Sequence, residues 1–136
     1  MNALAGVFLF KILATVLAWS LPLLLLPASW LSAAGLPVAE STLPLRLLGW
    51  AYLALCLGYG FGLKAALEGR RAMAPIWVGI VSNGGAVILL LAYGLSGHWH
   101  GWHPLVQVIA WGSIAAALLI TLGLYRFGVR GNGPKI

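Results

Sequence analysis

The stretch IWVGIVSNGGAVILLLAYGL, residues 76–95, decides the fold class of this chain. It carries no charged residue over 20 positions, and a helix of about 20 residues crosses the hydrocarbon core of a bilayer. Three further apolar stretches of similar length lie at residues 6–26, 45–63 and 105–125. The sequence therefore predicts an all-α integral membrane protein, a four-helix bundle with four spans.

The composition excludes several other classes of protein. Of 136 residues, 62% are hydrophobic and 7% are charged, and the mean hydropathy is +0.99. Soluble domains carry about 25% charged residues, so a soluble enzyme or a disordered segment is excluded. One cysteine, Cys56, excludes a disulfide scaffold. No linker is long enough to separate two domains, so residues 1–136 are expected to form a single transmembrane domain.

The basic residues predict the orientation of the spans. The connection after the second span and the C-terminal tail hold six of the eight basic residues: Lys64, Arg70, Arg71, Arg126, Arg130 and Lys135. Because Lys and Arg favour cytoplasmic segments, both termini are expected in the cytoplasm, and a multi-pass place in a bacterial inner membrane fits. The net charge of +6 is thereby explained by topology and lipid, without a nucleic-acid partner. The tail, residues 126–136, ends in a polar Gly/Pro segment that is expected to be mobile.

The first span has a second interpretation as a signal peptide. Residues 32–34 are Ser-Ala-Ala and resemble a small-residue cleavage site. The apolar stretch is longer than a usual signal sequence and contains Lys11. We therefore expect it to remain as a span, with Lys11 reaching to the cytoplasmic side.

Small and polar residues inside the spans predict where helices meet. Gly58 and Gly62 form a small-xxx-small pair, which permits close helix approach. Asn83 lies in the middle of the third span, where its amide cannot be satisfied by lipid. We expect it to face the bundle and to bond to a neighbouring helix.

The predicted outer side gathers the candidate binding residues. All three histidines lie within six residues, His98-Trp99-His100-Gly101-Trp102-His103. Trp30, Trp50, Trp99 and Trp102 are expected in an aromatic belt there, with Trp77 at the opposite interface. Arg46 opens the second span and could anchor to lipid phosphate or donate to a ligand. The candidate ligand- or lipid-binding residues are Arg46, Trp50, Asn83, His98, His100 and His103.

No catalytic set and no metal site is expected. The chain has no Asp, which excludes a Ser-His-Asp triad. Structural zinc sites need four ligands, and the histidine loop offers three imidazoles with no thiolate or carboxylate near it in sequence. No cofactor is therefore expected; the alternative is a quinone held on the outer side.

A further pattern spans about residues 19–95. Pro27, Trp30-Leu31 and Gly35-Leu36-Pro37 are followed by Leu45-Arg46-Leu47-Leu48-Gly49, a glycine-rich second span, a basic turn and an apolar third span. This pattern resembles the DoxX-like group of small bacterial four-helix membrane proteins. The resemblance implies a four-helix bundle, and some members are linked to thiosulfate or quinone redox complexes. This chain lacks the paired cysteines that would favour a thiol redox role.

Three functions fit these features. The first is a non-catalytic accessory subunit of a larger membrane assembly, since the spans hold few ionisable groups. Its partners would be membrane lipids and other membrane subunits or further copies of the chain. The second is a quinone- or lipophile-binding redox subunit with an outer-face site. The third is a small transporter that works as an oligomer.

Overall fold

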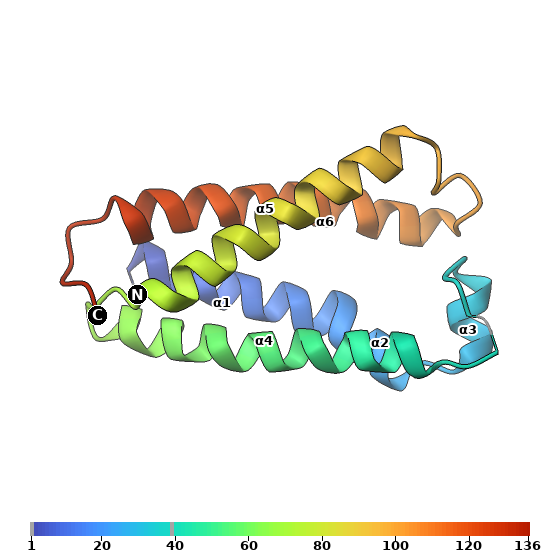
Figure 1. Cartoon of the computed structure of the whole chain (residues 1–136), viewed down its shortest axis with the longest axis horizontal. Coiled ribbons are helices and arrows are strands. Elements are labelled where there is room, and N and C mark those ends of the chain that lie inside the picture. Colours follow the sequence, from blue (N-terminus) through green and yellow to red (C-terminus); the bar gives the residue numbers. More distant parts are fainter. Residues whose placement is uncertain (1, 39) are drawn as a thin grey trace.

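The computed structural model describes residues 2–38 and 40–136, and these residues form an all-α bundle (Figure 1). Four helices are long and apolar enough to cross a membrane, as the sequence predicts. The elements are α1 (Ala3–Thr15), η1 (Val16–Ser20), α2 (Leu21–Leu25), α3 (Ala28–Ala33), α4 (Leu43–Leu67), α5 (Met73–Leu95), α6 (Pro104–Gly123) and η2 (Leu124–Val129). Helices α1, η1 and α2 together make the first span, and α6 with η2 makes the fourth.

The first span contains a π-helical turn, η1, just before Pro22. A proline within a helix lacks a donor and crowds the carbonyl of the preceding turn. The chain widens at this point, and the Leu21 amide donates to the carbonyl of Val16, five residues back. A π-turn is a common way to fit such a residue without ending the helix. The helix ends four residues later, where Leu26 adopts an extended backbone.

The bundle consists of two helix pairs. The most extensive contacts join the first span to α4 and join α5 to α6, whereas α4 with α5 and α1 with α6 meet over less surface. The two pairs share one buried cluster, which includes Phe8, Tyr59, Ile76 and Leu124. A second cluster, around Trp99 and Ile114, belongs to the α5–α6 pair alone. The pairs are thus held together chiefly by residues in one half of their length.

The two ends of the bundle have different character. Both termini and the α4–α5 connection lie at one end (Figure 1), which we call the basic end: Asn2, residues 68–72 and residues 130–136. The other end, the histidine end, holds α3 and residues 96–103. A bundle of four spans requires this arrangement, and it places the predicted basic segments together.

The two glycines of the predicted small-xxx-small pair have different surroundings. A Cβ on Gly62 would lie 2.6 Å from Cζ of Phe8 and 2.9 Å from Cβ of Pro75, so α4 meets α1 and α5 closely there. A Cβ on Gly58 would meet no atom of the described residues within 4 Å. Of the two glycines, only Gly62 therefore lies at the close helix contact that the small-xxx-small pair predicts.

The arrangement of the two ends gives a topological prediction. In a Cys56→Ala background, single cysteines at Glu68 and Gly101 should react with impermeant thiol reagents from opposite sides of the membrane. Glu68 and Gly101 are both exposed and lie at opposite ends of the bundle. Vesicles of known sidedness provide the measurement. Reaction of both cysteines from the same side would contradict a four-span arrangement.

Candidate functional site

Arg46 is a clamp between two helices. Its guanidinium donates to the carbonyl of Leu23 at 2.5 Å and to that of Leu26 at 2.7 Å. These carbonyls end α2 and have no helical partner of their own. A cation at a helix C-terminus also offsets the negative end of the helix dipole. The structure therefore assigns Arg46 a role in holding the end of the first span to α4, in addition to any contact with lipid.

The tryptophans divide into exposed and buried groups. Trp50, on α4, is 63% exposed, and Trp30 and Trp77 are also exposed, as an aromatic belt requires. Trp99 is only 3% exposed. Its ring stacks on Trp102 with 5.6 Å between centroids and meets Trp111 edge-on at 5.0 Å. The prediction that Trp99 belongs to the belt is wrong, because this ring fills the core of the α5–α6 pair.

At the histidine end, the ring of Trp102 also contacts the connection that follows α3. Gly35, with φ +90, lies so close to Trp102 that a Cβ would come within 2.8 Å of its ring. The His103 amide donates to the carbonyl of Ala34 at 3.1 Å. The connection after α3 therefore rests on the α5–α6 loop, and only a glycine permits this contact at position 35.

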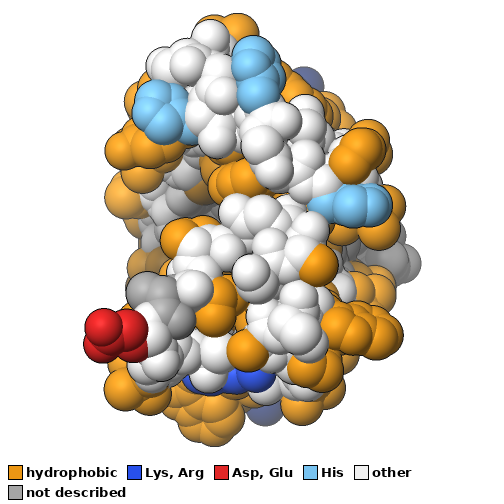
Figure 2. Space-filling view, turned by 90° about the vertical axis from the view of Figure 1, so that its right-hand side faces the viewer, with side chains coloured by type: hydrophobic (Ala, Val, Ile, Leu, Met, Phe, Trp, Pro, Cys, Tyr) orange, Lys and Arg blue, Asp and Glu red, His pale blue; other side chains and the backbone are white. Residues whose placement is uncertain are grey.

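The three histidines do not converge. Figure 2 shows their side chains apart from one another at the histidine end. His98 packs against the ring of Tyr93, with 4.9 Å between centroids, and Nδ1 of His103 accepts from the Leu105 amide at the start of α6. Within residues 2–38 and 40–136, no three His, Cys, Asp or Glu side chains are placed to hold a metal ion.

This geometry predicts that folding does not depend on metal. A chelator such as EDTA, and added Zn²⁺, should leave the thermal midpoint of the purified protein unchanged. The reason is that His98 and His103 are engaged in separate local contacts. A midpoint that falls on chelation and recovers with one equivalent of metal would contradict this interpretation of the loop.

Asn83 is buried but bonds within its own helix. It is 3% exposed, as expected for a residue that faces the bundle. Its Nδ2 donates to the carbonyl of Gly79, one turn earlier in α5, at 2.6 Å. The prediction of a bond to another helix is therefore wrong for this residue. Two side-chain hydrogen bonds between spans involve hydroxyl groups: Tyr59 with Ser82 at 2.8 Å, and Trp19 Nε1 to Ser113 at 3.0 Å.

A small polar cluster surrounds Tyr59 inside the bundle. Nζ of Lys11 lies 5.5 Å from the centroid of the Tyr59 ring, and Cys56 lies near the Lys11 ammonium. Lys11 and Tyr59 are each eight residues from the basic end of their helix, at Ala3 and Leu67. The ammonium thus stays near the depth of its own backbone and covers an aromatic face, which stabilises a cation away from water. Nothing in the sequence indicates that Lys11 and Cys56, 45 residues apart, lie near each other.

Arg71 is the most heavily bonded cation of the chain. It is 8% exposed. Its Nε donates to the carbonyl of Gly133 at 2.6 Å, and its Nη1 donates to the carbonyls of Gly128 and Val129 at 3.0 and 3.2 Å. Its backbone exchanges bonds with Pro134 and Ile136. The tail is therefore docked on the α4–α5 connection, and the expectation of a mobile tail is wrong.

Arg70, the neighbour of Arg71, is exposed and pairs with Glu68. Its guanidinium donates to the carboxylate and lowers the pKa of Glu68 below its ordinary value. This is the one ion pair among the described residues. Both side chains are exposed to solvent, so the ion pair contributes little to stability.

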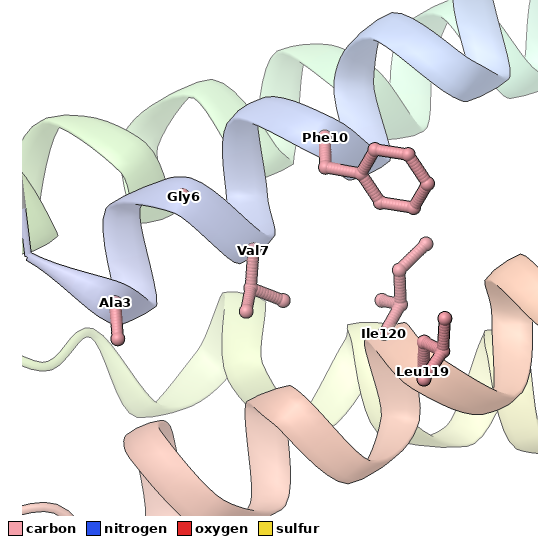
Figure 3. Close-up of a pocket in the computed structure, with 6 residues that line it drawn as sticks. All are labelled: Ala3, Gly6, Val7, Phe10, Leu119 and Ile120. Carbon is pink, nitrogen blue, oxygen red and sulfur yellow. The ribbon is translucent and has the colours of Figure 1, made fainter.

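Two hollows lie along α1. An apolar groove of about 300 Å³ separates α1 from α6 and is lined by Ala3, Gly6, Val7, Phe10, Leu119 and Ile120 (Figure 3). A second hollow, of about 200 Å³, lies at the basic end and is lined by Asn2, Ala3, Leu4, Gly69, Arg70, Arg71, Phe127, Gly131 and Gly133. Ala3 lines both.

Among the candidate residues of the sequence, Asn83 lies far from the histidine end. Asn83 is twelve residues from the histidine end of α5 at Leu95, which is about 18 Å along a helix. Arg46 is engaged with α2, Trp50 is exposed, and the three histidines lie in the α5–α6 loop. The hollows of Figure 3 and of the basic end involve none of these six residues.

Comparisons with known proteins give no relative: no family model, no curated protein and no solved structure matches the chain. Membership in the DoxX-like group thus stays a prediction from the residue pattern.

Proposed function

We propose that this protein is a non-catalytic accessory subunit that docks a helix of another membrane protein against α4. One observation carries the proposal. The α4 notch, Ala51, Ala54 and Gly58, is a strip of small residues on the outside of the bundle, between the exposed side chains of Leu47 and Phe61. These five positions share one helix face, because they recur at the helical spacing.

Small residues on a lipid-facing surface let a second helix approach closely. Helix association in a bilayer depends on van der Waals contact and hydrogen bonds, because lipid tails supply no hydrophobic drive. Within the chain, a Cβ on Gly58 would find open space as far as the described residues extend. The notch can therefore receive a helix of a neighbouring protein. The large side chains of Leu47 and Phe61, at its two ends, would fix the position of that helix.

The polar groups inside the spans also favour a non-catalytic role. The side chains of Trp19, Tyr59, Ser82 and Asn83 all make hydrogen bonds within the chain. Polar groups whose hydrogen bonds are already made within the chain are poorly placed to bind a substrate. A quinone site at the histidine end is less favoured, because Arg46 is engaged with α2, the Asn83 amide bonds within its own helix, and His98 and His103 make separate local contacts.

The six basic residues of the α4–α5 connection and the tail support an orientation with both termini in the cytoplasm. A multi-pass location in a bacterial inner membrane and kinship with the DoxX-like group rest on the sequence pattern. Lipids and one or more membrane subunits are then the expected partners.

The test compares two glycine variants in native membranes. Gly58→Leu should abolish co-purification of a stoichiometric partner, because the new side chain fills the α4 notch. Gly112→Leu, on α6, is the matched control, since a Cβ there also meets no described atom within 4 Å. Retention of the partner by Gly58→Leu, or its equal loss from both folded variants, would contradict docking at the notch. A partner identified as a second copy of the chain would replace the accessory role with self-association.

A further inference from the structure

From the hollows along α1 we infer a binding site for one anionic phospholipid, with its phosphate at the basic end and an acyl chain in the apolar groove between α1 and α6. The inference is independent of the proposed docking surface, because the α4 notch shares no residue with either hollow.

The groove has the composition and direction that an acyl chain needs. All of its lining side chains are apolar, and Figure 3 shows Val7 and Phe10 of α1 on the side of Leu119 and Ile120 of α6. Ala3 and Phe10 are seven residues apart, so the groove follows α1 for about 10 Å into the hydrocarbon region. Gly6 makes room for this path, because a Cβ there would meet no described atom within 4 Å.

The hollow at the basic end supplies the charge for a phosphate. Arg70 and Arg71 line it, and Glu68, paired with Arg70, is the one carboxylate in an ion pair among the described residues. Arg71 is 8% exposed, and its bonds go to neutral carbonyl groups that leave its charge uncompensated. A buried cation without a counter-charge is costly, and an anion in the hollow would supply that charge.

The start of α1 adds a second source of positive potential. Asn2, Ala3 and Leu4 line the hollow and form the cap and first turn of this 13-residue helix. No acidic residue lies in that turn, so the positive end of the helix dipole is open to an anion. The Asn2 side chain is already used, because Oδ1 accepts from the Ala5 amide and Nδ2 donates to the carbonyl of Ala66. Recognition of the phosphate would thus come from Arg70, Arg71 and the backbone amides.

The two hollows are arranged as the two parts of a phospholipid are. Ala3 lines both, so the apolar groove begins where the charged hollow ends. Val7 forms the contact between α1 and α6 at this level, where it lies so close to Gly123 that a Cβ on that glycine would come within 2.8 Å. A basic recess between spans at the membrane surface is a typical binding place for anionic headgroups.

The test uses native mass spectrometry of the purified full chain with phosphatidylglycerol and phosphatidylcholine of identical acyl chains. Phosphatidylglycerol should be retained in preference to phosphatidylcholine. Arg70→Gln should weaken phosphatidylglycerol binding about fivefold, the effect of one cation near an anionic surface. Gly6→Leu should weaken binding of both lipids, because its side chain fills the groove. The matched controls are Arg126→Gln, which removes an exposed charge outside the hollow, and Gly112→Leu, which adds a side chain in open space outside both hollows.

Three results would overturn the inference. Equal retention of the two lipids by the wild-type protein would show that the site does not select an anionic headgroup. Unchanged lipid binding in a folded Gly6→Leu variant would remove the groove. Thermal stabilisation by soluble glycerol phosphate equal to that by phosphatidylglycerol would indicate a site for a free anion without an acyl chain. Circular dichroism of each variant establishes that it is folded, and Gly6→Leu is expected to fold because its Cβ has open space.

Discussion

Replacement of Arg71 by methionine should lower the free energy of unfolding by about 2–4 kcal/mol, because it leaves buried carbonyl groups without a donor. The guanidinium of Arg71 bonds to the carbonyls of Gly128, Val129 and Gly133, which end the fourth span and begin the tail. Methionine has a similar length and fills the space, but it donates no hydrogen bond. Equilibrium unfolding in mixed detergent micelles measures the loss, and limited proteolysis should show cleavage within residues 130–136.

Arg70 provides the matched control for that experiment. Arg70→Met removes the same charge from the adjacent position, but the ion pair of Arg70 with Glu68 is exposed and should contribute much less to stability. Arg71→Lys should recover only part of the lost stability, since an ammonium is a point charge and cannot reproduce the planar fork of donors. Equal effects of Arg70→Met and Arg71→Met, or a tail that stays resistant to protease in Arg71→Met, would contradict the clamp.

The spans of this fold could be predicted from sequence because they depend on a local property. Uninterrupted apolar runs long enough to cross a bilayer are visible without knowledge of the partners of each residue. The helices exceed the predicted spans by a few residues at several ends, since helices continue past the hydrocarbon boundary. The short helix α3 was not predicted, because six residues carry too little periodicity to be recognised.

The roles of the polar side chains could not be predicted, because they depend on which backbone atoms lie nearby. In sequence, Arg46 and Arg71 look like ordinary arginines at a membrane interface, because each lies at or near the end of an apolar span. Their clamping roles arise from carbonyls that are 20 or more residues away, at Leu23, Leu26 and Gly128. A partial signal was present: each arginine lies where a helix end or a turn must leave carbonyls unpaired.

Asn83 and Trp99 illustrate two further limits of the sequence interpretation. An amide in a span must be satisfied, but the rule does not say by which group, and the nearest carbonyl belongs to its own helix. Trp99 follows the end of a span by four residues, which is typical of an interfacial residue. The turn after α5 instead folds its ring back between Trp102 and Trp111. Burial of this kind depends on loop geometry, which apolar periodicity does not report.

Replacement of Gly62 by alanine should lower the free energy of unfolding by about 1–3 kcal/mol, the usual cost of overpacking a tight contact. The new methyl group would lie 2.6 Å from Cζ of Phe8 and 2.9 Å from Cβ of Pro75. Phe8 is 1% exposed, so its ring has little space into which it can move. The close approach of α4 to α1 and α5 at this level would have to widen.

Gly58, one turn earlier on the same helix, is the matched control. Gly58→Ala should be neutral or slightly stabilising, by up to about 1 kcal/mol, because alanine favours helix more than glycine does. Its Cβ would meet no atom of residues 2–38 or 40–136 within 4 Å. Both variants replace a glycine of the same helix by alanine. A difference between their free energies of unfolding therefore reports the contact of position 62 with Phe8 and Pro75. Equal unfolding energies in detergent for Gly62→Ala and Gly58→Ala would mean that the helices do not meet closely at Gly62.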